Sequence, residues 1–224
     1  MNTRFSVLLI VAALTVLYSC KNNDEVFKTV PSSFLNVVNG SADTLNFYLN
    51  GTRQNNTSSL YPSGQSFYIS VPSGTQNYQF KKAGNSTVLF STPLTLVDSV
   101  NYSMYVYGEA SGSTFYTRDT LQTFTAYPDT TQVRFVNISP DAGNLDVYVG
   151  SALSFTTRAF KSSSAFSLFP GGATEVKVYQ SGSSTLKIDT TITFNAGGIF
   201  TIFSKGLLNG KGTAAFNIGV AQNH

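Results

Sequence analysis

The sequence predicts an all-β protein built from two tandem immunoglobulin-like antiparallel β-sandwich domains. Of its 224 residues, 54 are Ser or Thr and only 11% are charged, while helix formers such as Glu, Lys and Ala are scarce. Apolar runs of five to eight residues are divided by turn clusters, and no long segment follows the helical period. An internal repeat close to 100 residues long has the size of one such sandwich.

The first 19 residues have the features of a cleaved signal peptide. Arg4 supplies a positive charge, and an apolar run of 13 residues follows it, from Phe5 to Leu17. Thirteen residues suit the core of a signal peptide, whereas a bilayer span takes about 20. Cys20, the only cysteine, follows Leu17-Tyr18-Ser19 in a pattern that resembles a lipobox. We therefore expect residues 1–19 to be removed and Cys20 to carry a lipid that holds the chain to a membrane. An ordinary signal peptide that ends near a cysteine is the alternative.

Residues 20–31 are expected to form the lipidated cysteine and a flexible tether. Lys21 follows the cysteine, in place of the Asp that retains lipoproteins at the inner membrane of diderm bacteria. The acidic pair Asp24-Glu25 resembles the export signal of surface lipoproteins in Bacteroidota. These resemblances imply a lipid anchor in the outer membrane, with the cell-surface face slightly favoured over the periplasmic face. An ordinary solvated tether accounts for the same residues almost as well.

The chain aligns with itself at an offset of 98 residues, which rises to 100 for one segment. Four segments match in the same order: Val38-Asn39 with Val136-Asn137, Leu45–Leu49 with Leu145–Val149, Val71–Gly74 with Phe169–Gly172, and Leu94–Gly108 with Ile192–Gly206. Four ordered matches are the signature of a duplicated unit. The repeat predicts a first domain at residues 32–120, a linker at 121–131 and a second domain at 132–224.

Each repeat is expected to contain seven or eight antiparallel strands packed as two sheets. In Thr174–Val178 apolar and charged residues alternate, so the two valines can face a core while Glu175 and Lys177 face water. Ile199–Phe203 is apolar on both sides and is expected at the centre of a sheet.

One stretch of the second repeat carries a distinctive motif. Val133–Ala142 reads VRFVNISPDA, and Leu145–Val149 and the turn Pro170-Gly171-Gly172 follow it. This arrangement resembles the domain-of-unknown-function family 4397. The first repeat is a degenerate copy, because Asn39–Asp43 lacks the proline and Asn46 replaces the aspartate. The resemblance implies secreted or lipid-anchored bacterial β-sandwich domains, often in tandem, and it supplies no catalytic residues.

The sequence is poor in catalytic side chains. The only histidine is His224, where we expect a frayed end, and Cys20 is assigned to the lipid. A Ser-His-Asp or Cys-His centre and a His/Cys zinc site are therefore not expected. A glycosidase needs only two carboxylates, but most of the 11 acidic residues lie in predicted turns or linkers. We expect no enzymatic activity and no cofactor.

Some residues remain candidates for ligand binding or modification. Asp141 and Asp146 are weak Ca²⁺ candidates, although Pro-Asp is also a common turn starter. Tyr105 and Tyr107 share a strand face, where they form either an aromatic platform for a sugar or ordinary packing contacts. Five of the eight Asp precede Ser or Thr in triplets that resemble the O-glycosylation acceptor of Bacteroidota, and turn chemistry explains these triplets equally well. The five acceptors are Thr44, Ser99, Thr120, Thr130 and Thr190.

The net charge of +3 comes from scattered basic residues, so no nucleic-acid surface is expected. The sequence favours a non-catalytic, lipid-anchored envelope protein whose two domains bind polysaccharide or another envelope protein. A structural spacer or accessory subunit of an outer-membrane assembly is the alternative. An unrecognised carbohydrate-active enzyme is less favoured than either.

Overall fold

The computed structural model describes residues 30–121 and 128–224. Residues 31–224 form one compact unit. The expected signal peptide, Cys20 and nearly all of the expected tether lie outside the described residues. Within the two described ranges, no helix has the length and apolar character that a membrane span requires.

The first repeat folds into two sheets of four strands each, in the orders β4-β1-β7-β8 and β3-β2-β5-β6. Its strands are β1 (Ser32–Asn39), β2 (Leu45–Leu49), β3 (Thr52–Arg53), β4 (Gln65–Pro72), β5 (Gly74–Lys82), β6 (Phe90–Leu96), β7 (Asn101–Val106) and β8 (Thr114–Asp119).

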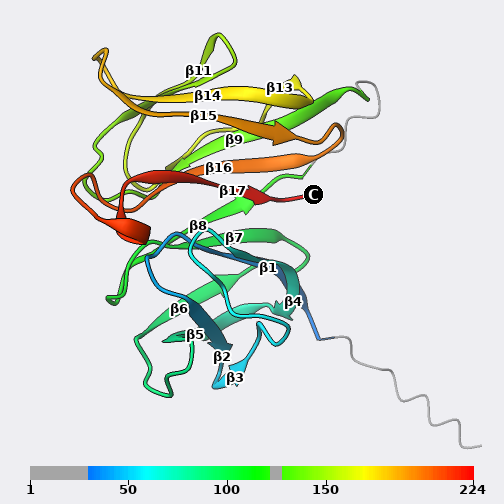
Figure 1. The fold of residues 1–224 in the computed structure, drawn as a ribbon. Coiled ribbons are helices and arrows are strands. Elements are labelled where there is room, and N and C mark those ends of the chain that lie inside the picture. The colour runs from blue at the N-terminus through cyan, green and yellow to red at the C-terminus, as the bar shows by residue number, and fades with distance from the viewer. Residues whose placement is uncertain (1–29, 122–127) are drawn as a thin grey trace, which may run out of the picture. The chain divides into compact units, whose positions relative to one another are not determined.

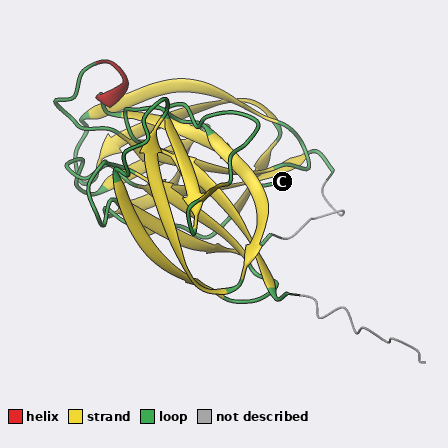
Figure 2. Cartoon of the chain, turned by 90° about the horizontal axis from the view of Figure 1, so that it is seen from below, coloured by secondary structure: helices red, strands yellow, loops and turns green. Residues whose placement is uncertain are grey.

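The second repeat also folds into two sheets, in the orders β12-β9-β16-β17 and β11-β10-β14-β15, and β13 pairs with β9 as well. Its elements are β9 (Thr130–Asn137), β10 (Leu145–Val149), β11 (Ala152–Arg158), β12 (Ser162–Ser163), β13 (Ser167–Pro170), β14 (Gly172–Gln180), β15 (Leu186–Phe194), β16 (Ile199–Lys205), the 3₁₀ helix η1 (Gly212–Ala214) and β17 (Asn217–Gln222). Strands dominate the whole of the described chain (Figure 2).

The two repeats follow the same path. β1 begins at Ser32 and β9 at Thr130, 98 residues later, and the same offset relates β7 to β16 and β5 to β14. The predicted tandem β-sandwiches are therefore confirmed. The expectation of purely antiparallel strands is wrong at two places, because β1 pairs in parallel with β7, and β9 with β16. A parallel neighbour requires a long crossover, and here the strands between the pair provide it.

Each repeat has its own apolar core. Leu35, Phe47 and Met104 belong to the first core, and Phe135, Val147 and Ile202 belong to the second. The predicted alternation in β14 is confirmed, since both of its valines are fully buried. The prediction for β16 is also confirmed, because every residue of this strand is buried between β9 and β17.

A third apolar cluster joins the two repeats. It contains Val38 and Tyr105 from the first repeat and Val136, Ile138, Phe203 and Ala221 from the second. Alternate residues of one strand divide between the clusters, because successive side chains of a strand point to opposite faces. In β7, Met104 faces the core of its own repeat and Tyr105 faces the other repeat. The sheet that contains β1 and β7 thus packs, through its outer face, on the sheet that contains β9 and β16 (Figure 1).

The contact between the repeats is nearly two-fold symmetric, because residues at equivalent positions meet. Tyr105 and Phe203, 98 residues apart, pack with ring centroids 6.0 Å apart. A Cβ at Gly40 would collide with Cδ1 of Ile138, which is the equivalent residue of the second repeat. Such self-complementary contact is typical of the interface of a symmetric dimer.

Candidate functional site

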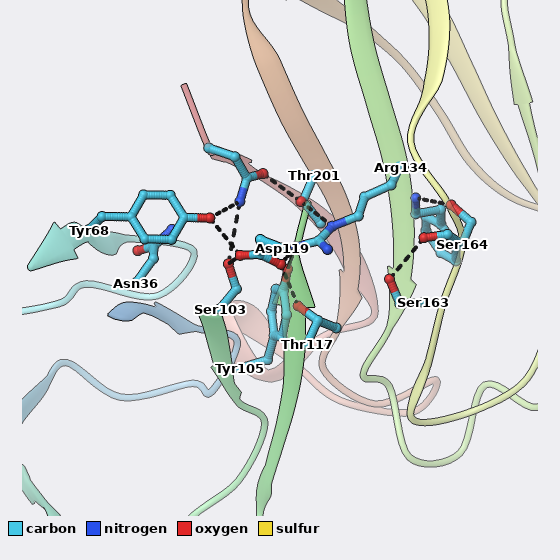
Figure 3. Close-up of polar contacts among 12 residues, drawn as sticks. Asn36, Tyr68, Ser103, Tyr105, Thr117, Asp119, Arg134, Ser163, Ser164 and Thr201 are labelled. Atoms are coloured by element: carbon cyan, nitrogen blue, oxygen red, sulfur yellow. Dashed lines mark hydrogen bonds and ion pairs between the residues drawn. The ribbon is translucent and has the colours of Figure 1, made fainter. Parts of the chain in front are cut away.

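A buried ion pair lies at the interface between the repeats. Nη2 of Arg134, on β9, is 2.6 Å from Oδ1 of Asp119, the last residue of β8. The two side chains are 3% and 0% exposed. Figure 3 shows them pointing toward each other. Arg134 lies on the face of β9 opposite Val133 and Phe135, which point into the second core. Its position in the strand therefore directs the guanidinium to the first repeat.

Asp119 accepts further hydrogen bonds from three hydroxyl groups. Their donors are Oη of Tyr68 at 2.5 Å, Oγ of Ser103 at 2.6 Å and Oγ1 of Thr117 at 2.9 Å. Burial, followed by the negative charge of Asp119, raises the pKa of Tyr68 above its usual range. A carboxylate with four donors around it has little capacity left to accept a hydrogen bond from a ligand.

Arg134 makes further contacts within the interface. Nε donates to Oγ1 of Thr201 at 2.8 Å, and Nη2 also donates to the hydroxyl of Tyr105 at 3.1 Å. Its guanidinium carbon lies 4.6 Å from the ring centroid of Phe166. Burial opposes the positive charge, but Tyr105 and Asp119 outweigh burial and raise the pKa of Arg134. Arg134 therefore keeps its positive charge in spite of its burial.

The second repeat supplies a neutral counterpart to this network. Asn223 holds the place in its sheet that Asp119 holds in the first, since each pairs with the first residue of the strand beside it. Its Oδ1 accepts a hydrogen bond from Thr201 at 2.7 Å, and its Nδ2 donates to Tyr68 at 2.9 Å. The interface thus carries an ion pair at one of its two equivalent places and the neutral side chain of Asn223 at the other.

An open groove with a volume of about 810 Å³ adjoins the ion pair. It lies between the end of β8 and the segment that joins β12 to β13. Its lining residues are Thr117, Arg118, Thr120, Gln132, Arg134, Ser163, Ser164, Ala165, Phe166, Ser167 and Leu168. Most of these side chains are polar and none is acidic.

The groove exists because one strand of the second repeat is interrupted. In the first repeat, β4 is continuous over eight residues, and its Tyr68 reaches across the interface to Asn223. In the second repeat, the equivalent segment is divided into β12 and β13, and residues 164–166 between them line the groove. Phe166 is the equivalent of Tyr68 but stacks on Arg134 without crossing the interface. Tyr68 therefore bridges the two repeats at one edge of the interface, and the groove remains at the other edge.

The two Ca²⁺ candidates bind backbone amides of different loops. Both carboxylate oxygens of Asp141 accept from the amide of Leu208, at 3.0 and 3.1 Å. Asp146 accepts from the amides of Thr157 at 2.6 Å and Gly182 at 3.4 Å. In the described part of the chain, no three His, Cys, Asp or Glu side chains are grouped to hold a metal ion. This geometry favours the structural role that the sequence left open.

The five acceptor residues are at least partly accessible. Ser99 and Thr120 are exposed, and the other three, Thr44, Thr130 and Thr190, are half-buried. The preceding aspartates have structural roles in several triplets: Asp98 accepts from the amide of Ser32 at 2.8 Å, and Asp119 is the buried partner of Arg134. Glycosylation of these residues stays a prediction, as does lipidation of Cys20.

Tyr105 is fully buried between the repeats, so of the two alternatives it forms the packing contact and offers no platform for a sugar. One expectation is wrong. His224 is not frayed, because its backbone exchanges hydrogen bonds with Ile199 at 3.0 and 3.2 Å. This pairing continues the β16–β17 ladder and positions Asn223 at the interface. The signal that could have located the ion pair is Arg134 itself, a charge inside the apolar run VRFV.

Comparison with known proteins gives a family match and little else. The model of a domain of unknown function, DUF4397, matches residues 33–148 and 131–217. Comparison with curated proteins finds no match. Among solved structures, the TIE protein of Bacillus anthracis matches at 11% identity and a TM-score of 0.25, over 81% of this chain and 34% of that one. This chain spans about a third of that protein, and a likeness at this TM-score supports no argument.

Proposed function

We propose that this chain, which belongs to the DUF4397 family, is a non-catalytic envelope protein that binds polysaccharide or another envelope protein. Its lipid anchor at Cys20 would hold it at the outer membrane, with the two repeats acting as one binding module. The groove between the repeats is the observation that carries the binding proposal, because it is open, polar and large enough for several sugar rings or a short peptide.

The residues around the groove support a binding role without catalysis. General acid–base catalysis needs a side chain that exchanges a proton near the working pH. The lining residues described here include no His, Asp or Glu, and the neighbouring Asp119 is already bonded to four donors. What remains is a set of hydrogen-bond donors and acceptors suited to recognition.

A glycan array tests the binding proposal. The chain from Lys21 onward, without its lipid, is applied to the array, and a restricted set of bound polysaccharide fragments is expected. A parallel pull-down from the envelope of its own host tests for a protein partner. If neither method recovers a ligand, the binding proposal is wrong.

The spacer function keeps one observation in its favour. The buried ion pair and the third apolar cluster fix the repeats to each other, as a rigid spacer requires. A spacer binds no glycan and tolerates substitutions in the groove without loss of function, so the same array separates the two proposals.

The anchor has its own test. Incorporation of labelled palmitate is expected for the wild-type chain and not for Cys20→Ser. A wild-type chain that incorporates no label contradicts the lipid anchor and leaves the binding proposal to be judged alone.

A further inference from the structure

The outward face of one sheet of the first repeat carries basic side chains and no acidic one. The sheet is β3-β2-β5-β6, and none of its four strands contains Asp or Glu. Arg53 on β3 pairs with Tyr48 on β2, and Lys81 on β5 pairs with Asn46 on β2. These four residues lie on the side of the sheet opposite Phe47, which points into the first core. The outward face is therefore basic.

Printed contacts hold the two basic groups over the same strand. Nη2 of Arg53 donates to Oδ1 of Asn46 at 2.8 Å, and Nζ of Lys81 lies 4.4 Å from the ring centroid of Tyr48. Asn46 and Tyr48 are two residues apart on β2, so their side chains are neighbours on one face. Among the described residues, the ion pairs of this sheet involve only Lys82. The two cations are thus adjacent, and no carboxylate neutralises them.

The equivalent face of the second repeat is acidic. Leu153 and Tyr179 stand where the first repeat has its two cations, because they pair with the equivalent residues of β10. Three carboxylates outnumber Lys177 and Lys187 in this sheet. The carboxylates belong to Asp146, Glu175 and Asp189, at the positions of Asn46, Asn77 and Ser91 in the first repeat. Since both repeats have the same fold, the fold itself does not require a basic face on the first.

The basic face belongs to the repeat that the tether enters. The carbonyl of Pro31 accepts a hydrogen bond from the amide of Ser73 at 2.9 Å, between β4 and β5. Cys20 precedes Pro31 by 11 residues, which span at most about 40 Å when fully extended. In Figure 1 the sheet with β2 and β5 forms one end of the stack of sheets, and the sheet with β14 and β15 forms the other. A lipid on Cys20 thus keeps the basic face within reach of the membrane.

We propose that the outward face of the sheet β3-β2-β5-β6 rests on an anionic membrane surface, with Arg53 and Lys81 at the lipid phosphates and Tyr48 among the headgroups. This inference rests on the proposed lipid anchor and adds the orientation of the anchored molecule. Such side chains place an apolar stem or ring beside lipid and a polar end in water. Each cation near the surface attracts it weakly, but a tethered domain has a high local concentration, so a weak contact is sufficient.

Attachment to vesicles tests the orientation. The chain from Cys20 to His224 is coupled through its only thiol to a maleimide lipid, in vesicles of phosphatidylcholine with or without phosphatidylglycerol. The chain has no Trp, so Gln79→Trp reports the face of the first repeat and Thr191→Trp that of the second. Brominated lipids should quench Gln79→Trp on the anionic vesicles, about threefold or more above Thr191→Trp, and added salt should reduce this quenching.

Removal of the two charges tests the residues themselves. With Gln79→Trp as the reporter, Arg53→Gln and Lys81→Gln together should lower the quenching about threefold or more. Lys81→Gln alone leaves the hydrogen bond of Arg53 intact and should act in the same direction. The matched control, Lys187→Gln with Lys211→Gln, removes two charges from the second repeat and should leave the quenching unchanged. Thermal melts followed by circular dichroism verify that each variant is folded.

The remaining outcomes overturn the proposal. Equal quenching at the two faces, quenching that is insensitive to lipid charge, or no quenching at all would each contradict it. Self-association of the uncoupled protein in sedimentation, abolished by the double variant and accompanied by no quenching, would overturn it in favour of the acidic face of a second copy. Because the anchor is supplied chemically, these results do not depend on lipidation in the cell, which palmitate labelling decides separately.

Discussion

Replacing Arg134 by Met isolates the contribution of the buried ion pair. The methionine retains most of the aliphatic stem but leaves the Asp119 carboxylate, which is 0% exposed, without its cation. Removing one partner of a buried pair typically costs about 3–5 kcal/mol. Asp119 keeps its three hydroxyl donors, so we expect a loss at the lower end, about 3 kcal/mol. Against a total stability of roughly 5–15 kcal/mol for a domain, this is a large fraction.

The first repeat provides a control pair of the same length. Nζ of Lys82 is 2.6 Å from Oδ2 of Asp43, but these side chains are 39% and 38% exposed. Lys82 also lies 2.9 Å from Glu109, and all three side chains are exposed to solvent, so Lys82→Met should change the free energy of unfolding far less than Arg134→Met does. The double variant Arg134→Met/Asp119→Asn should recover about 2 kcal/mol, since the buried charge is gone.

Urea denaturation followed by circular dichroism measures these differences, because the chain has no Trp to report by fluorescence. We also expect Arg134→Met to separate unfolding into two transitions, since each repeat has its own core. Equal effects of Arg134→Met and Lys82→Met would refute the reasoning, because burial would then make no difference to the value of the pair.

Three further predictions address packing, buried hydroxyls and domain independence. Gly40→Ala should destabilise the protein by about 1–3 kcal/mol, because its Cβ would collide with Cδ1 of Ile138. Adding Ile138→Val removes this methyl group and should restore much of the lost stability in a thermal melt. A double variant as unstable as Gly40→Ala would argue against direct contact between the two residues. Tyr78→Phe should raise the free energy of unfolding at pH 7 by about 1 kcal/mol, because the Tyr78 hydroxyl is buried without a partner among the described residues. Burial also raises the pKa of Tyr78 to about 12, so between pH 10 and 12 this hydroxyl ionises in the unfolded chain only, and the wild type should lose stability there. The difference in urea midpoint between the wild type and Tyr78→Phe should therefore be larger at pH 11 than at pH 7. An equal difference at the two pH values would contradict this. A fragment from Gln132 to His224 should melt cooperatively, and a disordered fragment would show that the second core depends on the first.

The tandem architecture could be predicted from sequence because duplication leaves a measurable offset. The strand pattern within each repeat could also be predicted, since the alternation in β14 reflects one solvent-facing side and one buried side. The interface between the repeats could not be predicted. A strand that is apolar on both faces, such as β16, looks the same whether its second face is covered by its own domain or by a neighbour.

The polar site was hidden for a different reason. Arg134 and Asp119 lie on either side of the expected linker, and no local pattern relates a charge in one repeat to a charge in the other. The groove depends on the interruption between β12 and β13, at residues 164–166. Ser-rich sequence at this place is compatible with a strand, a turn or a loop, so periodicity alone could not locate the opening.

The near two-fold interface also determines the valency of the molecule. A dimer of identical subunits would display the same groove at both edges of its interface, or at neither, and two grooves could cross-link two ligand chains. Because the two repeats belong to one chain, one edge has stayed open while Tyr68 bridges the other. Under the proposed function each molecule would offer one binding site, and strong attachment to a long polymer would depend on how densely the molecules are gathered.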